Sequence, residues 1–377
     1  MKITALKTWV IPQGLFVKVE TDEGIHGIGC DGLSRQGHAV AETIKAFSPD
    51  VIGQDPFRIE HLWQVMFRGG FFPGGVIQSA AVSAVDIALW DIKGKALGVP
   101  VYELLGGLTR DKVVCYPHIG GRHDLDELAR CAKQAVDEGW RFVRWGMCDP
   151  AGSGVLEPGR AVRFGIEQVR VVRETVGDDI GICFDVHTRL DPPSAIEFCN
   201  GVQQYRPFFV EDPLRSESPQ SLRLLRQHTS VPIAVGEQWD SKWRFQQAIE
   251  EDLLDYIRLD LGIVGGLTEA KKIAGWGETH YIHLAPHAPG GTVATAAALH
   301  LCLSSPLVGV CELPSPPMSY LTDVFPRQMP FRDGHLLPPE GPGLGIDFDE
   351  KAMDETRAMT YEKGFGFRRD DGSYANW

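Results

Sequence analysis

Short apolar runs alternate with longer helix-like stretches through the second half of the chain, and six of these runs end in a polar group. The six groups recur about every 25 residues, at Asp185, Glu211, Glu237, Asp260, His287 and Glu312. An apolar strand followed by a helical stretch at a regular interval predicts stacked βα units. The runs VVCYPHIG and RFVRWGM precede these six, so the pattern predicts eight strands and a β/α barrel that begins near residue 113.

The first part of the chain follows a different pattern. Residues 2–30 alternate apolar and polar positions around an Asp-Glu-Gly turn, which predicts antiparallel strands, and residues 36–47 have helical periodicity. The glycine-rich stretch RGGFFPGG at 68–75 is expected to be either a mobile lid or a plain surface loop. The next helix is predicted to be amphipathic, with one apolar face formed by Val82, Val85, Leu89, Ile92 and Ala96.

Three glycines near the N-terminus offer a different interpretation. Gly27, Gly29 and Gly32 match the GxGxxG pattern of dinucleotide-binding proteins, which would indicate an NAD-dependent oxidoreductase. That fold also needs a second parallel strand, ending in an acidic residue, after the helix. The sequence there is SPDVIGQDPF, which is broken by proline and glycine and has no strand pattern. A glycine-rich exit from the strands accounts better for these residues.

Length and charge narrow the classes of function. The chain has 377 residues, more than the roughly 250 of a plain β/α barrel, so a second, smaller domain is expected. The net charge of −13 argues against nucleic acid as a partner, because binding its backbone requires clustered Lys and Arg. The same charge means that an anionic substrate needs local positive charge, from a metal ion or from arginines.

Cysteines and apolar runs indicate the compartment. The eight cysteines form no CxxC pair, and Cys115, Cys183 and Cys311 lie in strand-like apolar runs, so buried thiols of a reduced protein are expected. The N-terminus MKITALKTWVIP lacks the apolar region of a signal peptide. No apolar run approaches the roughly 18 residues of a membrane span. These features predict a cytoplasmic protein without a membrane partner.

Three of the strand ends carry carboxylates that are expected to converge: Asp185, Glu211 and Glu237. Acids brought so close raise one another's pKa unless a cation neutralises them. Oxygen-only ligation favours Mg²⁺ over Mn²⁺ or Zn²⁺. One such acid alone could merely cap a helix or pair with an arginine, but three at equivalent positions predict a metal site.

Three histidines raise the alternative of a zinc site: His280, His283 and His287. Pro286 and the strand-like run YIHLAPH oppose the helical face that an HxxxH zinc site needs, so His280 and His283 are expected to be structural. His287 ends the strand next to the one that ends in Asp260. A carboxylate there would fix the imidazole tautomer and raise its basicity, which predicts that His287 is a general base.

Two further residues complete a predicted reaction. His187 lies two positions beyond Asp185 and suits a general acid across the barrel mouth from His287. Arg144 would either bind an anionic substrate or form a salt bridge with a ligand carboxylate. Mg²⁺ on a substrate carboxylate makes the adjacent C–H more acidic and stabilises the enediolate formed on its removal. One histidine would take that proton and the other would protonate a departing β-hydroxyl.

Short motifs distributed over essentially the whole chain resemble those of one family. They are TDEG, SAVDIALWDIKGKALGVPVYELLGG, FDVHTR, VEDP, GEQ, LAPHAP and GPGLGI, with Asp260 and Glu312 at strand ends. Together these motifs are highly specific, and the chain resembles the mandelate racemase/muconate lactonizing group of the enolase superfamily. Members of this superfamily use a Lys or His base together with Mg²⁺.

The resemblance implies a two-domain α/β fold. A (β/α)8-type barrel, TIM-like but modified, would span residues 113–315. An α+β capping domain would be built from residues 1–112 and from the C-terminal segment 316–377. Loops near residues 12–15 and 68–75 would close over the barrel and select the substrate. Homo-oligomers are usual in the group, so a homo-oligomer is expected.

The resemblance also implies roles for the site residues. The three carboxylates would hold one Mg²⁺, the Asp260–His287 dyad would be the base, and Glu312 would hydrogen-bond the substrate carboxylate or enediolate. His187 is similar to the histidine that expels the 3-hydroxyl in acid-sugar dehydratases, especially galactonate dehydratase-like members. Many members carry Lys-x-Lys on the second strand, where this chain has Arg144 and Gly146. The missing lysine base weakens a racemase interpretation, while an arginine there is known in mannonate dehydratase-like relatives.

The sequence therefore predicts a Mg²⁺-dependent dehydratase that converts a sugar acid, either an aldonate or an aldarate, into a 2-keto-3-deoxy acid. A racemase, epimerase or cycloisomerase of another carboxylate is the alternative in the same superfamily. A non-catalytic barrel protein and an NAD-dependent oxidoreductase are more remote. Substrate stereochemistry would be read by the lid loops and by side chains such as Arg189, His118 and Phe72.

Overall fold

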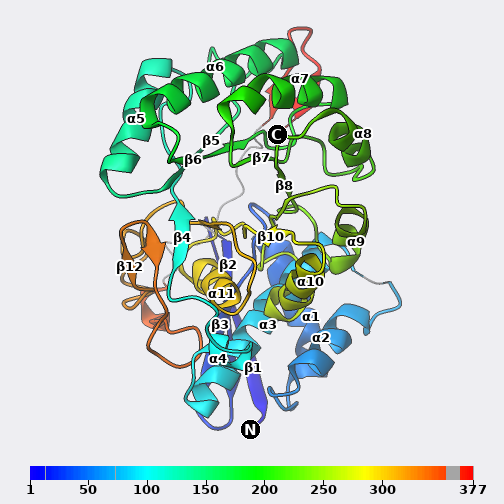
Figure 1. The fold of residues 1–377 in the computed structure, drawn as a ribbon. Coiled ribbons are helices and arrows are strands. Elements are labelled where there is room, and N and C mark those ends of the chain that lie inside the picture. Colours follow the sequence, from blue (N-terminus) through cyan, green and yellow to red (C-terminus); the bar gives the residue numbers. More distant parts are fainter. Residues whose placement is uncertain (13, 73, 354–365, 377) are drawn as a thin grey trace.

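A ring of parallel strands forms the centre of the larger domain (Figure 1). The computed structural model describes residues 1–377 except 13, 73, 354–365 and 377. Strands β5 to β10 pair in chain order, β11 pairs with β4, and single bridges from His118 to Arg144 and from Leu284 to Val308 close the ring. The strands are β4 (Val113–Tyr116), β5 (Phe142–Gly146), β6 (Gly181–Asp185), β7 (Phe209–Glu211), β8 (Ile233–Val235), β9 (Tyr256–Ile257), β10 (His283–Leu284) and β11 (Cys311–Glu312). The predicted β/α barrel is confirmed.

A helix follows each barrel strand from β4 to β10. These helices are α5 (Leu125–Asp137), α6 (Pro158–Val176), α7 (Pro192–Val202) with the 3₁₀ turn Gln203–Tyr205, α8 (Ser221–His228), α9 (Lys242–Glu250), α10 (Gly266–Glu278) and α11 (Thr292–Leu303). Helix α5 begins where the side chain of Asp124 accepts the N–H of Glu127 at 2.8 Å. Helices α6 and α7 begin with proline, which lacks an N–H that the first turn does not use. No helix in the described part of the chain is long and apolar enough to cross a membrane.

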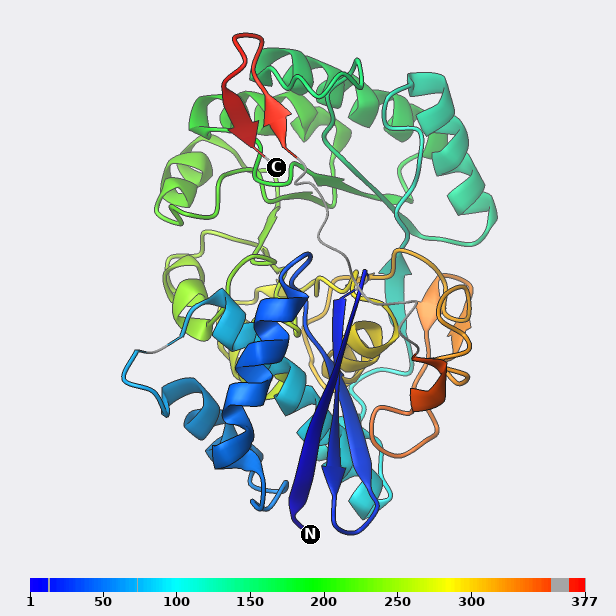
Figure 2. The same ribbon diagram turned by 180° about the vertical axis from the view of Figure 1, so that it is seen from behind.

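The described part of the segment after β11 adds strands to the barrel. Strands β12 (Phe331–Arg332) and β13 (His335–Leu336) form a hairpin, and β13 pairs antiparallel with β4. A 3₁₀ turn follows at Glu350–Ala352. The last described residues form the hairpin of β14 (Phe367–Arg368) and β15 (Tyr374–Asn376), which is bridged to Val155 before α6 and lies far from the N-terminus (Figure 2).

The N-terminal residues form an antiparallel sheet covered by helices. Its strands, in spatial order, are β1 (Ile3–Ile11), β2 (Gly14–Thr21) and β3 (His26–Cys30). The helices are α1 (Gly37–Val51), α2 (Ile59–Arg68), α3 (Val76–Leu97) and the short α4 (Val101–Leu104). Leu15, Val17 and Val19 of β2 join a second apolar core with α1, α2 and α3. The alternation in residues 2–30 thus predicted this sheet correctly.

Helix α3 is buried on nearly all sides, so the prediction that it is amphipathic is wrong. Every residue from 79 to 89 is buried, including Ser83 and Asp86. The reason is that α3 lies between the N-terminal sheet and helix α10 of the barrel. The polar side chains of α3 face α10. Ser83 accepts the N–H of Gly265 at 2.8 Å, and Asp86 accepts the N–H of Thr268 at 3.0 Å. These bonds satisfy donors at the start of α10.

Two of the three glycines of the GxGxxG match, Gly27 and Gly29, are explained by the same helix. A Cβ at Gly27 would lie 1.9 Å from the carbonyl oxygen of Ala88, and one at Gly29 would lie 1.8 Å from that of Ala84. Strand β3 therefore packs its backbone directly on the backbone of α3. The glycines serve this close packing, which is the alternative that the sequence favoured over a nucleotide site.

Asp91 of α3 connects the N-terminal sheet to the C-terminal segment. Its carboxylate accepts the N–H of Ile28 in β3 at 3.0 Å and the N–H of Leu344 at 2.8 Å, and it pairs with Lys95 at 2.6 Å. Aromatic contacts of Trp9 with Phe348 and of Phe16 with Phe325 extend this interface. The C-terminal segment thus contacts the N-terminal sheet before it returns to the barrel as β14 and β15. The domain boundaries at 112 and 315 stay predictions.

Replacing Asp91 with alanine is expected to lower the free energy of unfolding by about 2–5 kcal/mol, because two buried N–H groups lose their acceptor and each costs roughly 1–3 kcal/mol. Urea denaturation followed by circular dichroism measures the change. The matched control is Asp137→Ala, which removes an exposed carboxylate paired with Lys133 and should change stability by less than about 1 kcal/mol. Equal stability of the two variants would contradict the assignment.

Candidate active site

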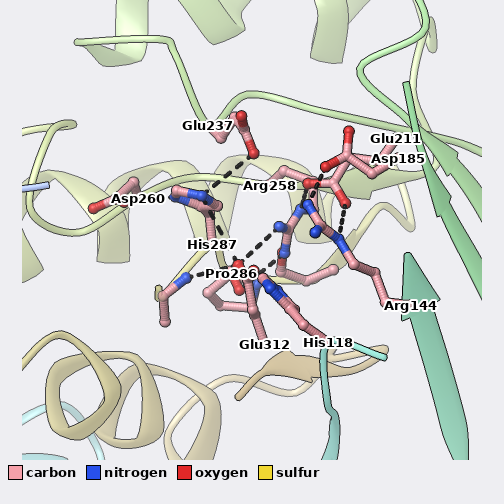
Figure 3. A network of polar contacts seen from close by, with 12 residues as sticks. His118, Arg144, Asp185, Glu211, Glu237, Arg258, Asp260, Pro286, His287 and Glu312 are labelled. Atoms are coloured by element: carbon pink, nitrogen blue, oxygen red, sulfur yellow. Dashed lines mark hydrogen bonds and ion pairs between the residues drawn. The ribbon is translucent and has the colours of Figure 1, made fainter. Parts of the chain in front are cut away.

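Three carboxylates meet where β6, β7 and β8 end (Figure 3). Asp185 and Glu211 are the last residues of neighbouring strands and are partners in register, and Glu237 lies two residues after β8. One oxygen from each side chain lies within 4.8 Å of the other two, and all three side chains are buried. Among the described residues this is the one group of three or more acidic, His or Cys side chains with such spacing.

Electrostatics show that this cluster suits a cation. Burial raises the pKa of Glu237 to about 8, and Glu211 and Asp185 add to the shift. Burial also disfavours charge on Asp185, but His187 and Arg144 outweigh it and hold the pKa of Asp185 below its ordinary value. The Oε2 atoms of Glu211 and Glu237 are buried and have no hydrogen-bond donor in the described structure. Such a set of oxygens fits a hard divalent cation.

His287 and Asp260 form the predicted pair. Nδ1 of His287 lies 2.6 Å from Oδ2 of Asp260, and Oδ1 of Asp260 accepts the N–H of Gly262 at 2.6 Å. The other ring nitrogen, Nε2, lies 3.4 Å from Oε2 of Glu237, beside the metal cluster. Burial lowers the pKa of His287, but the charges of Glu237, Glu312 and Asp260 raise it to about 10. A cation on the carboxylates would oppose this shift and favour the neutral ring that a base requires.

His187 contacts the ligand side of the cluster. Its Nε2 lies 2.6 Å from Oδ2 of Asp185 and 3.2 Å from Nη2 of Arg144. The φ angles of His187 and Thr188 are 52° and 55°, in the left-handed region that such residues seldom adopt. The side-chain amide of Asn376 donates to the carbonyl of Thr188 at 2.5 Å. The C-terminal strand β15 therefore supports the turn that carries His187.

On the second barrel strand, β5, Gly146 and Arg144 stand where many members of the group have two lysines. A Cβ at Gly146 would lie 3.2 Å from Nδ1 of His187, so a larger residue would crowd that ring. Arg144 is buried and pairs with Asp185, and its Nε lies 3.9 Å from Oε2 of Glu211. The structure therefore shows the salt bridge that was one of the two predicted roles of Arg144. A contact between Arg144 and substrate stays a prediction.

Glu312 is fully buried and both of its oxygens have partners. Oε1 lies 2.6 Å from Nε2 of His118, and Oε2 accepts the N–H of Ala288 and a guanidinium N–H of Arg258, each at 3.0 Å. His118 thus holds Glu312, and its expected contact with the substrate stays a prediction. The sequence pattern did not single out Arg258. The signal was present, because Arg258 stands two positions before Asp260 and therefore faces the same side of an extended strand.

Two residues that were predicted to contact the substrate make other contacts in the described structure. Arg189 is buried, donates to the carbonyl of Met147 and lies 4.8 Å over the ring of Phe367 in the C-terminal hairpin. Phe72 is 83% exposed and packs edge-on against Phe71 at 5.2 Å. The lid role of 68–75 and the substrate contacts of Arg189 and Phe72 stay predictions.

The other two histidines of the zinc alternative, His280 and His283, lie apart from the carboxylate cluster. His280 pairs with Asp252 at 2.9 Å, and His283 lies in β10 with its ring 6.1 Å from that of Tyr256. The zinc alternative therefore finds no ligand group among the described residues.

Comparison with known protein families shows which family has this arrangement of domains. Residues 3–106 match the mandelate racemase/muconate lactonizing enzyme N-terminal domain, and residues 127–352 match the enolase C-terminal domain-like family. The chain is a member of the enolase superfamily. It belongs to the mandelate racemase/muconate lactonizing enzyme group, as the motifs indicated.

Named relatives align over the full length of this superfamily member. A D-galactonate dehydratase of Ralstonia nicotianae is 37% identical over 386 aligned positions, covering 100% of both chains. The crystal structure of an enolase from Pantoea ananatis with bound d-gluconate and Mg has a TM-score of 0.91 at 32% identity and covers 99% of both chains. An enolase from Agrobacterium radiobacter with bound Na and L-malate has a TM-score of 0.90 at 30% identity and covers 100% of both chains.

Replacing Asp185 with asparagine is expected to weaken Mg²⁺ binding by at least about 100-fold, because the change removes one of three anionic oxygens at the cluster. Isothermal titration calorimetry without substrate measures the affinity. Glu269→Gln is the control, since Glu269 is equally buried but pairs with Lys242 and Lys272 on helices. Unchanged Mg²⁺ affinity in Asp185→Asn would refute the metal site.

Proposed function

We propose that this protein is a Mg²⁺-dependent acid-sugar dehydratase that converts an aldonate or aldarate into a 2-keto-3-deoxy acid. The observation that carries the proposal is the placement of two histidines on one carboxylate cluster, His287 near Glu237 and His187 on Asp185. One histidine can remove a proton and the other can assist a leaving group, which is what β-elimination of water requires. Full-length similarity to D-galactonate dehydratases supports the same class of reaction.

His287 begins the reaction in this proposal. Asp260 accepts a hydrogen bond from the Nδ1–H of His287, so the lone pair of Nε2 faces the site and takes the α-proton of the substrate. The electron pair of the broken C–H bond is first shared with the carboxylate as an enediolate, and it forms the double bond between the α and β carbons only when the β-hydroxyl leaves. A divalent cation held by Asp185, Glu211 and Glu237 would stabilise the negative charge that develops on the substrate carboxylate.

His187 completes the elimination. In its protonated form it gives a proton to the β-hydroxyl, which leaves as water with the electrons of the C–O bond. The enol product then tautomerises to the 2-keto-3-deoxy acid. For this step the ring of His187 turns from Asp185 toward the substrate. The ring has room to turn because Gly146, which lies beside it, has no side chain. Arg144 keeps Asp185 oriented while His187 acts.

The alternative functions fit the site less well. A racemase that uses two bases needs a second base on the opposite face of the substrate, and the second strand offers Arg144, whose guanidinium remains protonated at all relevant pH values. An NAD-dependent oxidoreductase would need glycines free to approach a pyrophosphate, whereas Gly27 and Gly29 pack on α3. A non-catalytic barrel would not need the dyad of Asp260 and His287 together with the carboxylate cluster.

A library of aldonic and aldaric acids, incubated with Mg²⁺ and assayed for 2-keto products, tests the proposed function. At least one acid is expected to yield a 2-keto-3-deoxy product, and chelation by EDTA should abolish the turnover. Exchange of the α-hydrogen with D₂O in the absence of any keto product would instead favour the racemase alternative.

Two single variants should distinguish the roles of His287 and His187. His287→Asn is expected to abolish both dehydration and α-hydrogen exchange, whereas His187→Asn should lower dehydration by at least about 100-fold and retain exchange. Proton NMR in D₂O follows both processes. His280→Asn, which changes a histidine paired only with Asp252 in the described contacts, serves as the control and should retain both activities. Exchange that persists in His287→Asn would exclude His287 as the base.

A further inference from the structure

Arg258 has no exposed surface, which is unusual for arginine and requires strong partners. Its guanidinium donates four hydrogen bonds within the barrel end (Figure 3). The acceptors are Oε1 of Glu211 at 2.6 Å, the carbonyls of Ala285 at 2.8 Å and Pro286 at 3.0 Å, and Oε2 of Glu312 at 3.0 Å. These acceptors belong to three different strand ends, in β7, after β10 and in β11.

The bond to Glu211 determines which oxygen remains for a cation. Oε1 of Glu211 is held by Nε of Arg258, whereas Oε2 has no donor among the described residues. Rotation of the carboxylate would break a short bond to a charged donor, which is among the stronger hydrogen bonds in proteins. Arg258 thus keeps Oε2 of Glu211 available to the cluster with Asp185 and Glu237.

The hydrogen bonds from Arg258 to two backbone carbonyls hold the segment that carries the proposed base, His287. Ala285 and Pro286 immediately precede His287, and their carbonyls both point at the same Nη1 of Arg258. The N–H of His287 donates to the carbonyl of Leu259, the residue after Arg258, at 3.0 Å. The backbone that carries the imidazole is therefore fixed to the strand of Arg258 from two sides.

From these contacts we infer that Arg258 is a positioning residue, which fixes the metal-ligand face of Glu211, the backbone of His287 and the carboxylate of Glu312 relative to one another. It reaches no substrate, since it has no exposed surface. The flat guanidinium is needed because its N–H groups leave in several fixed directions in one plane. A lysine carries the same charge on one nitrogen and cannot reach all three strand ends. The catalytic part of this inference rests on the proposed function, but the part that concerns Mg²⁺ does not.

Arg258→Lys tests the inference while it keeps the charge of the site. Mg²⁺ affinity without substrate, measured by isothermal titration calorimetry, is expected to fall by about 10- to 100-fold. With a sugar acid that the protein dehydrates, kcat should fall by a similar factor, while the KM for that acid changes by less than about threefold. If no sugar acid is turned over by the unchanged protein, the proposed function fails and the Mg²⁺ affinity still decides the role of Arg258.

Arg173→Lys is the matched control. The guanidinium of Arg173 also binds backbone carbonyls, those of Tyr205, Gly177, Ile180 and Arg206, but none of these residues belongs to the site. Its loss should lower the melting temperature and leave Mg²⁺ affinity and kcat within about threefold. An Arg258→Lys protein that behaves in the same way, less stable but with both parameters unchanged, would overturn the inference.

Arg258→Gln provides a second test if the lysine variant does not fold. Glutamine makes the site more negative, so charge alone would tighten Mg²⁺ binding, whereas lost orientation of Glu211 would weaken it. The inference expects weaker binding. Tighter or unchanged binding in a folded Arg258→Gln protein would overturn it.

Discussion

Repulsion between buried carboxylates is the constraint on which this barrel end depends. Five acidic side chains are linked there by ion pairs, Asp185, Glu211, Glu237, Asp260 and Glu312, and a sixth, Asp212, lies buried beside them. Like charges this close in a poorly hydrated interior oppose one another strongly. Arg144, Arg258, His118 and His287 offset part of that repulsion through direct contacts. The part that remains helps burial to raise the pKa of Glu237 and that of its buried neighbour Asp212, and this imbalance is what makes the cluster attractive to a divalent cation.

The strands can hold the acids in place because the layers around them are rigid. Helix α3 is enclosed between the N-terminal sheet and α10, and close backbone contacts at Gly27 and Gly29 leave little freedom to slide. The N-terminal domain also reaches the dyad, since a Cβ at Gly32 would lie 2.6 Å from Oδ1 of Asp260. The position of the base is thus determined by both domains together.

Much of this arrangement could be predicted from the sequence because it repeats. The interval between strand ends follows from the length of one βα unit, so Asp185, Glu211 and Glu237 could be placed at one level before any coordinates were known. The burial of α3 has a signal in the sequence, because small apolar residues such as Ala80, Ala84 and Ala88 surround the predicted apolar face; only the contacts of Ser83 and Asp86 with α10 depend on the tertiary structure. The role of Arg258 could be predicted only in part. Its place two positions before Asp260 indicates a side chain that faces the barrel interior, but no local pattern distinguishes a partner of two buried carboxylates from a residue that binds substrate. The contact of Arg189 with the C-terminal hairpin could not be predicted either, because it joins segments that are far apart in the sequence and no local pattern indicates it.

The bond between Asn376 and Thr188 has a consequence for the order in which the site is built. Thr188 follows His187 in a turn of unfavourable φ angles, and Asn376 lies at the end of the last strand. During synthesis, the barrel strands leave the ribosome well before this strand does. The turn at His187 therefore gains its support only once β15 has been made, so the group proposed to expel water is the last part of the site to be fixed in place.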